Sequence, residues 1–356
     1  MDSSRATPTA ASKKQFLEAA AKLPRSADRA IAMPLGGSTF RALMVGRRDD
    51  VLDHFEAPHP ADHYLDAAHA IAAALLHFGS LPVAGAAFLA GMVPKRGRLR
   101  FTNLAGWPPF DRDVTMKHFG FATEWLNDGT AGYYGLPRMS GNDFAILRKG
   151  QYRTGDTYIY AIFGTGMNVG CPVTREDSHL LFVPRTDEDR AMQMWLKKFL
   201  GHLPDWEDIT SGGMGMRNVA EYYLDTDKVS ATDPYATALR DHPAQRRGEI
   251  VTAFALRGHP SAKKAAQMAF TSLGSWLGAM AVSHQALRID LSPGILADPE
   301  MREFCLHETN FLAAFVEQGR PMFREFVEDC TVRICLRNPE HEGAVERAAE
   351  LLHQHS

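Results

Sequence analysis

The chain has 356 residues, of which 45% are hydrophobic, and its formal net charge is -3. A chain of this length can bury two cores of ordinary domain size, so we expect two lobes. The nearly balanced charge gives no field that would favour nucleic acid or an anionic membrane. Small polar ligands are therefore the expected partners.

The cysteines show neither CxxC spacing nor the density of a small secreted scaffold, so we expect reduced thiols in the core and a cytoplasmic location. They are Cys171, Cys305, Cys330 and Cys335. The opening stretch MDSSRATPTAASKK lacks the apolar centre of a leader peptide, and no apolar run is long enough to span a bilayer. The sequence predicts no membrane segment.

Residues 1–22 are rich in Ser, Thr, Ala and Lys and are expected to be an N-terminal tail with weak helical potential. Two apolar runs, 30–33 and 40–45, flank a glycine pair and predict a β-hairpin. After the hairpin we expect a helix at 62–79 and strands at 82–93, 98–104 and 122–128. The last strand ends at an Asn-Asp pair, and strand ends often carry chemistry.

Four histidines fall in the stretch VLDHFEAPHPADHYLDAAHA, at positions 54, 59, 63 and 69. Their spacing does not place all four on one helical face, and Pro60 interrupts the run. We therefore expect histidines on the surface or on the flank of a helix and no metal site.

The segment 138–156 is polar and rich in turn residues, and 157–173 then repeats the pattern of strand, glycine turn and strand. Apolar spacing of three and four predicts helices at 188–201, 218–224, 244–258 and 261–286. A strand at 286–291 follows, and a strand at 332–336 with a helix at 343–354 forms a last β-α step.

The expected domain organisation follows from these elements. It consists of a tail at 1–22, a small α/β lobe at 23–137, a large helix-rich α/β lobe at 138–336, and a helix at 337–356 that returns to the small lobe.

Six segments resemble, in chain order, motifs of the bacterial glucokinases, in the superfamily of sugar kinases, actin and heat-shock ATPases. LGGST resembles the first phosphate loop, RFTNLAGW the Thr-Asn-x-x-Trp segment, and WLNDGTAGYYGLP the Asn-Asp-x-x-Ala strand end. FGTGMNVG resembles the second phosphate loop, EDSH the sugar-binding Glu-x-x-His, and EDITSGGMG the Glu-x-x-x-Ser-Gly segment. The CxxGC zinc cluster of the related repressors and open-reading-frame kinases is absent from the sequence, which favours the glucokinase branch.

The resemblance implies an α/β fold of two ribonuclease-H-like lobes with a cleft between them. It also implies transfer of a phosphoryl group from ATP, with Mg2+, to the 6-hydroxyl of glucose or a related hexose. Asp128 would be the base, because phosphoryl transfer needs a proton acceptor beside the attacking hydroxyl. The implied hexose contacts are Asn127, Asp128, Glu176, His179 and Glu207. The implied nucleotide contacts are Gly36, Gly37, Ser38, Thr39, Gly164, Thr165 and Gly166.

Each motif also has a purely structural interpretation. Asn-Asp-Gly is an ordinary turn that can cap the next helix, the acidic segments can be solvated loops, and the glycine pairs can be tight hairpins. The hairpin interpretation is compatible with phosphate binding, so the two do not exclude each other.

Three positions depart from the family pattern, all on the nucleotide side. Pro34 stands where the family has an aspartate that organises metal and phosphates, and a proline should also alter the strand. Asn168 replaces a glycine of the second loop, and Pro293 replaces the first glycine of a Gly-Gly turn. Two hypotheses follow: an active hexose kinase, or a sugar-binding pseudokinase that acts as a sensor or regulatory module. The sequence leaves open whether the chain forms a homodimer.

Overall fold

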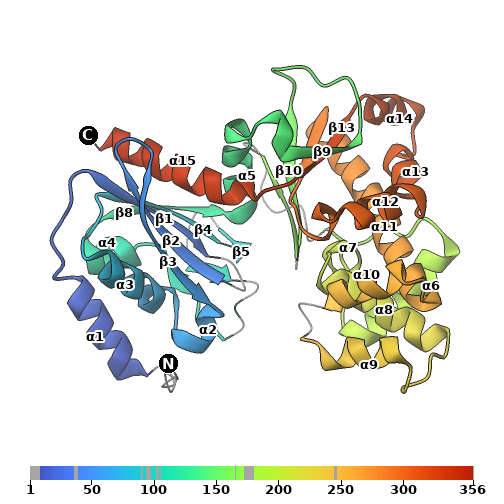
Figure 1. Ribbon diagram of the computed structural model, residues 1–356, viewed down its shortest axis with the longest axis horizontal. Coiled ribbons are helices and arrows are strands. Elements are labelled where there is room, and N and C mark those ends of the chain that lie inside the picture. Colours follow the sequence, from blue (N-terminus) through green and yellow to red (C-terminus); the bar gives the residue numbers. More distant parts are fainter. Residues whose placement is uncertain are drawn as a thin grey trace. The chain divides into compact units, whose positions relative to one another are not determined.

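The computed structural model describes residues 9–35, 39–89, 91–93, 98–101, 104, 106–164, 166–171, 180–243 and 247–355. They divide into two compact units, of which the first combines the chain up to Met139 with the segment from Pro339 onward. The second unit is Ser140–Asn338. Within the described residues, each unit contains a sheet of five strands with helices packed against it (Figure 1).

The sheet of the first unit has the strand order β3, β2, β1, β4, β8. Its strands are β1 (Arg29–Leu35), β2 (Thr39–Gly46), β3 (Val51–Pro58), β4 (Ala84–Leu89) and β8 (Ala122–Asn127). The first three form an antiparallel meander, and β4 and β8 run parallel to β1. This is the topology of a ribonuclease-H-like lobe, and it confirms the expected hairpin and fold class.

Helices cover both faces of this sheet. α3 (Ala67–Phe78) packs with Ile31, Met33 and other side chains of one face. α15 (Pro339–Gln354) packs on the opposite face with Ala30 and Phe88, beside α5 (Asp128–Gly135) (Figure 1). Alternate residues of β1 therefore enter two different cores, as the pleat of a strand requires.

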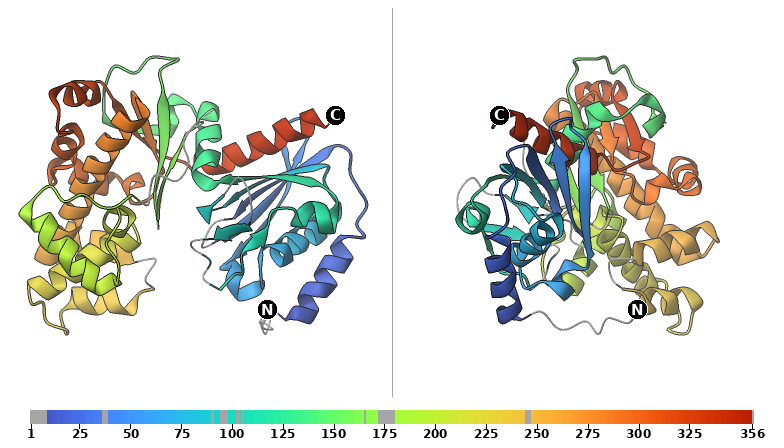
Figure 2. Two further views of the ribbon diagram at one scale, coloured as in Figure 1. Left: turned by 180° about the vertical axis from the view of Figure 1, so that it is seen from behind. Right: turned by 60° about the vertical axis from the view of Figure 1, so that its left-hand side comes forward.

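The segment expected to be a tail contains a helix. α1 (Ala10–Ala20) begins at a capping box formed by Thr9 and Ser12, and Ala20 is fully buried. It lies alongside α3, where Lys13 pairs with Asp66 and the Phe16 ring meets the edge of His69 at 5.0 Å (Figure 2). The apolar side of α1 and the Lys13–Asp66 ion pair therefore hold residues 10–20 on the first unit.

The structure adds one element to residues 51–79 and corrects another. The stretch 51–58, which carried no prediction of its own, is the edge strand β3, and its mostly exposed side chains hide the usual alternation of buried residues. The helix expected at 62–79 is split into α2 (Pro60–His63) and α3, because Asp66 caps α3 by accepting from the His69 amide. His69 is 2% exposed and is a core residue rather than a surface histidine.

The smaller elements of the first unit complete its edge. α4 (Val114–Phe119) precedes β8, and the short 3-10 helix η1 (Leu136–Arg138) follows α5. A separate small sheet is formed by β5 (Gly91–Met92), β6 (Arg98–Phe101) and β7 (Phe110–Asp111).

The sheet of the second unit has the strand order β11, β10, β12, β13, β9. Its strands are β9 (Phe144–Arg148), β10 (Tyr158–Phe163), β11 (Met167–Gly170), β12 (Arg288–Leu291) and β13 (Thr331–Cys335). The strand β9 lies in the segment expected to be turns. It forms because FAILR pairs antiparallel with β13, which is far away in the sequence.

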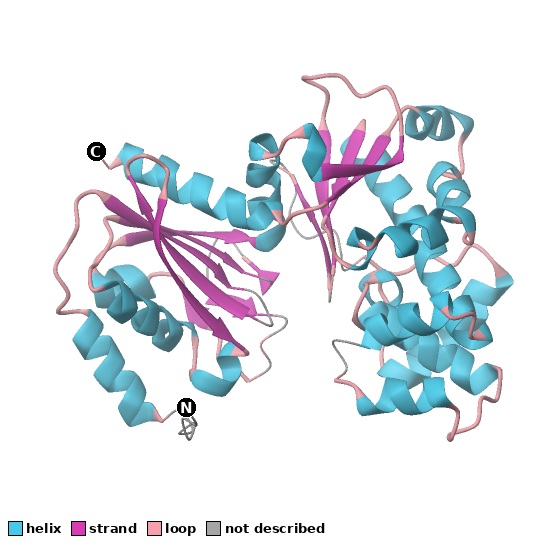
Figure 3. Cartoon of the chain, in the orientation of Figure 1, coloured by secondary structure: helices cyan, strands magenta, loops and turns pink. Residues whose placement is uncertain are grey.

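The second unit is mainly helical (Figure 3). Its central helix is α11 (Pro260–His284), and Phe270 and Trp276 on this helix are fully buried. The others are α6 (Asp187–Leu200), α7 (Glu207–Thr210), α8 (Met214–Thr226), α9 (Pro234–Asp241), α10 (Arg247–Leu256), α12 (Pro299–His307), α13 (Phe311–Val316) and α14 (Pro321–Glu328), with 3-10 helices η2 (Gly141–Asp143) and η5 (Ile295–Ala297).

The cysteine prediction is confirmed, because all four thiols are free and buried. Of the helices in the described part of the chain, none combines the length and the apolar character that crossing a membrane requires.

Candidate active site

Three parallel strands of the first unit end at one edge of the sheet. Leu35 at the end of β1 is in register with Leu89 of β4, and Leu89 is in register with Asn127 of β8. The carboxyl ends of these three strands therefore lie side by side, at the kind of sheet edge where open α/β sheets bind ligands. Asp128, the predicted base, follows Asn127 directly at this edge.

The local hydrogen bonds fix the Asn-Asp pair in place. Asn127 is the N-cap of α5: its Oδ1 accepts from the Gly129 amide at 2.9 Å, and its Nδ2 donates to the Gly91 carbonyl at 3.0 Å. Asp128 is the first residue of α5, and its Oδ1 also accepts from the Gly129 amide at 2.9 Å. Both side chains are half-buried. The capping interpretation of this pair is thus correct, and capping holds the carboxylate at the sheet edge.

Two glycines set the position of α5 against α15. A Cβ on Gly135 would lie 1.8 Å from the Pro339 carbonyl oxygen, and a Cβ on Gly343 would lie 1.7 Å from the Ala131 carbonyl oxygen. The two helices therefore approach backbone to backbone, which only glycine permits. This contact holds the helix that carries Asp128.

The proline of the first phosphate loop leaves its strand intact. β1 continues through Pro34, which is in parallel register with Phe88 of β4, so the expected alteration of the strand does not occur. Compared with the family pattern, Pro34 removes a carboxylate from this position of the sheet edge. The difference is therefore in the charge that can hold a metal, not in the backbone. Thr39 begins β2 opposite Pro58. Gly36, Gly37 and Ser38 lie outside the described residues.

The second glycine turn joins β10 and β11. The Gly164 amide donates to the Gly166 carbonyl at 3.0 Å, which closes the turn. Gly164 has no positive φ, and among the described residues no heavy atom lies within 4 Å of the place its Cβ would take. Neither backbone strain nor packing in the described chain requires glycine here, and the open space suits a ligand that approaches the backbone. Thr165 lies outside the described residues.

The segment that carries Glu207 is bonded to this turn. Glu207 begins α7, and its carbonyl accepts from the Ser211 hydroxyl at 2.8 Å. Two residues on, the Gly213 amide donates to the Gly164 carbonyl at 3.0 Å. The structure thus brings the Glu207 segment and the second glycine turn together. Glu176 and His179 lie outside the described residues.

The other two departures from the family pattern also leave the backbone undisturbed. Asn168 lies in regular strand β11 opposite Ile162 and has no positive φ, so this position does not require glycine. Beside Pro293, Gly294 has φ 39°, and its Cβ would lie 2.2 Å from the Phe163 carbonyl oxygen. The glycine that this turn requires is therefore still present.

Sequence reasoning missed the residues that lock this part of the second unit. The Ser292 hydroxyl accepts from the Phe163 amide at 2.7 Å and holds the end of β10. A Cβ on Gly248 would lie 1.7 Å from the Gly212 carbonyl oxygen, so α10 packs directly on the Glu207 segment. Gly294 was visible in LSPGIL, but nothing in the sequence pairs Gly248 with Gly212.

Comparison with known proteins gives the family. The model of the Glucokinase family matches residues 35–350. A glucokinase of Chromohalobacter salexigens is 26% identical over 274 residues, which is 73% of this chain and 79% of that protein.

Three solved structures share the fold. The glucokinase of an Antarctic psychrotroph has a TM-score of 0.66 at 21% identity, covering 91% of this chain and 99% of that one. The Balamuthia mandrillaris glucokinase, solved with glucose, has a TM-score of 0.70 at 18% identity, with 96% and 99% covered. A ROK family glucokinase of Streptomyces griseus, solved with glucose and AMPPNP, has a TM-score of 0.59 at 20% identity, with 90% and 99% covered. This chain belongs to the glucokinase family of sugar kinases.

Proposed function

We propose that the protein transfers a phosphoryl group from ATP to the 6-hydroxyl of glucose or a closely related hexose, with Asp128 as the general base. The observation that carries the proposal is the position of the Asn127–Asp128 pair, held by α5 at the carboxyl edge of a ribonuclease-H-like sheet. Sugar binding alone would not need a carboxylate fixed at such an edge. Free, buried thiols support a cytoplasmic location.

The hexose contacts combine carboxylates, an amide and an imidazole. The proposed contacts are Asn127, Asp128 and Glu207, and the family motif adds Glu176 and His179. A pyranose presents neighbouring hydroxyls that both donate and accept, and carboxylate oxygens accept from them strongly. This set suits a neutral sugar with several adjacent hydroxyls.

Asp128 would accept the proton of the attacking hydroxyl as the sugar oxygen bonds to phosphorus and the bond to the ADP oxygen breaks. The Gly129 amide, which bonds both Asn127 and Asp128, holds the carboxylate in one orientation for that step. The described backbone around Gly164 fits a nucleotide, because no heavy atom of the described chain lies within 4 Å of the place a Cβ would take there. When bound, ATP supplies the phosphoryl group and Mg2+ screens the phosphate charges.

A coupled assay with glucose and magnesium ATP tests the proposal. Continuous ADP release that depends on both substrates is the expected result. Sugar binding without any turnover across hexoses and phosphoryl donors would instead identify a sugar-binding pseudokinase. The undisturbed backbone at Asn168 and Gly294 is the observation that favours the kinase over this second candidate.

Glucose is expected to raise the thermal stability of the protein, because a ligand that binds only the folded state stabilises it by mass action. At about 100 times its dissociation constant, the sugar should add about 2.7 kcal/mol. A melting-temperature series with glucose, mannose, fructose and, as a control polyol, glycerol measures the effect. If none of the hexoses shifts the melting temperature at concentrations well above millimolar, the hexose site does not exist.

Replacing Pro34 by aspartate is expected to raise phosphorylation and to tighten the binding of magnesium ATP. The new carboxylate would lie at the end of β1, at the sheet edge that also carries Asp128, where it can help hold a metal near the phosphates. Turnover as a function of Mg2+ concentration measures the change. Pro34→Asn, which restores the amide without the charge, is the matched control. A folded Pro34→Asp protein with lower activity than the wild type would show that the chain handles phosphate in another way.

A further inference from the structure

Two short segments of the second unit, 180–182 and 204–206, pair antiparallel beside Glu207. Two backbone hydrogen bonds of 3.1 Å and one antiparallel bridge join them, and we call this pair of segments the clasp. Trp206 directly precedes Glu207, and Leu180 directly follows the Glu-x-x-His segment in the sequence. The clasp therefore joins the flanks of two segments that carry proposed hexose contacts.

Phe182 is the anchor of the clasp. It is 4% exposed, whereas Leu180, Leu181 and Val183 are each more than half exposed. Its ring packs edge to face with the buried ring of Trp206, with 4.9 Å between the ring centres. Two short strands are only marginally stable by themselves in water, so the buried aromatic pair supplies most of the stability of the clasp.

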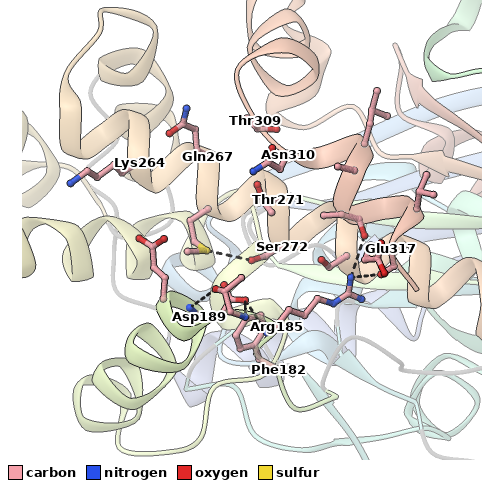
Figure 4. Close-up of a pocket in the computed structure, with 18 of the residues that line it drawn as sticks. Phe182, Arg185, Asp189, Lys264, Gln267, Thr271, Ser272, Thr309, Asn310 and Glu317 are labelled. Atoms are coloured by element: carbon pink, nitrogen blue, oxygen red, sulfur yellow. Dashed lines mark hydrogen bonds between the residues drawn. The ribbon is translucent and has the colours of Figure 1, made fainter. Parts of the chain in front are cut away.

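Two helices hold the Phe182 side of the clasp. The Gln193 side-chain amide of α6 donates to the Phe182 carbonyl at 2.9 Å. Three residues on, the Arg185 guanidinium donates to the carbonyl oxygens of Ala314 at 3.3 Å and Glu317 at 2.6 Å, at the end of α13 (Figure 4). The last carbonyl groups of a helix lack partners within it and carry partial negative charge, so a guanidinium suits them. The segment that contains Phe182 is thereby tied to both α6 and α13.

The other side of the clasp leads directly into α7. Trp206 is the N-cap residue of this helix, and its carbonyl accepts from the Thr210 amide at 2.8 Å. Glu207 is the first of only four residues in α7. The place of Trp206 therefore sets where the backbone of Glu207 lies.

We propose that Phe182 and Arg185 are positioning residues of the hexose site, which hold Glu207 in place through the clasp. The inference rests on the proposed sugar binding by Glu207, and it assigns Phe182 and Arg185 no contact with the sugar. Side chains that bind a ligand must be held within about 0.5 Å of the productive geometry by the residues packed around them. The clasp supplies that support on the N-terminal side of α7.

Glucose titration and steady-state kinetics of Phe182→Ala test the proposal. We expect glucose affinity to fall by about 2- to 30-fold, the range for residues that act on a site through other residues. The kcat at saturating glucose should stay near the wild-type value, because a loss of ground-state binding raises KM alone. Phe304→Ala is the matched control and should leave glucose affinity unchanged. Phe304 is a phenylalanine of α12 with 6% exposure in the same hydrophobic core, outside the clasp.

A double-mutant cycle separates positioning of Glu207 from a general loss of stability. If Phe182 acts through Glu207, Phe182→Ala should cost less glucose affinity in the Glu207→Gln background than in the wild type, so the two effects are less than additive. Arg185→Ala should weaken glucose binding like Phe182→Ala, and it replaces Phe182→Ala in the cycle if that variant does not fold. Its control is Arg190→Ala, which removes an exposed arginine of α6 that pairs with Asp187.

Two results would overturn the positioning role. They are glucose affinities of Phe182→Ala and Arg185→Ala equal to those of their controls, and fully additive effects with Glu207→Gln. If the wild type binds no hexose, the proposed function fails before any variant is made, and hydrogen exchange of residues 204–211 then decides whether the clasp holds α7. Phe182→Ala should speed exchange there, and exchange no faster than in Phe304→Ala would contradict the clasp.

Discussion

Asp128→Asn is expected to reduce turnover by roughly 10²–10⁴-fold, the usual cost of losing a general base. The hexose affinity should stay nearly the same. Asparagine keeps the size of the side chain and an oxygen that can accept from the Gly129 amide at the start of α5, so the cap and the fold are preserved. The amide cannot accept the hydroxyl proton. Initial rates with magnesium ATP, together with glucose affinity from titration, separate the two effects.

The control for this variant is Asp187→Asn, which changes the same residue type at the same position of a helix, the first residue of α6. Asp187 is exposed and lies outside the candidate site, so turnover should be unchanged. If Asp128→Asn keeps near-normal turnover, another group is the base and the assignment is wrong. If the wild-type protein has no turnover but Asp128→Asn binds glucose like the wild type, the chain is a sugar-binding pseudokinase.

Gly343→Ala is expected to lower the free energy of unfolding by about 3 kcal/mol, the upper range for overpacking a tight contact. The new Cβ would lie 1.7 Å from the Ala131 carbonyl oxygen, and a backbone oxygen within a helix cannot swing aside as a flexible side chain can. α5 and α15 would have to separate. Because α5 carries Asp128, turnover should fall as well in whatever fraction stays folded. Urea unfolding followed by circular dichroism measures the loss of stability.

Gly141→Ala is the matched control for Gly343→Ala. No heavy atom of the described chain lies within 4 Å of the Cβ that it would add, and Gly141 has no positive φ. Its stability should stay within about 0.5 kcal/mol of the wild type, as for most surface substitutions. Equal stability of Gly343→Ala and the wild type would mean that α5 and α15 pack less closely than the structure shows.

The sequence alone determined those strands and helices whose pattern of apolar and turn residues lies within a short stretch of the chain. The apolar runs around Gly36 and Gly37 predicted the β1–β2 hairpin, and the sequence also predicted the strand that ends at Asn127. Both depend on hydrophobic patterning and turn residues within a few positions of each other. The order of motifs along the chain was also enough to predict the family and the ribonuclease-H-like lobes.

Elements that depend on distant partners could not be predicted in this way. The strand β9 exists because β13 pairs with it, although FAILR lies between turn residues and gives a weak local signal. The strand β3 is an exposed edge strand, so burial leaves no alternating pattern to detect. His69 is a core residue because Phe16 of α1 and Tyr64 both pack against its ring.

In the candidate site, too, the sequence predicts the residues and the tertiary structure shows what holds them in place. The sequence predicted Asp128 as the base, but only the tertiary structure shows that a capped helix, held by Gly343 against α15, fixes this carboxylate at the sheet edge. The sequence also suggested that Asn168 and Pro293 weaken the nucleotide side. The structure shows an ordinary strand at Asn168 and keeps the required glycine at Gly294. The physical reason is that backbone conformation and close approach depend on which segments meet, and residues more than 200 positions apart meet only after folding.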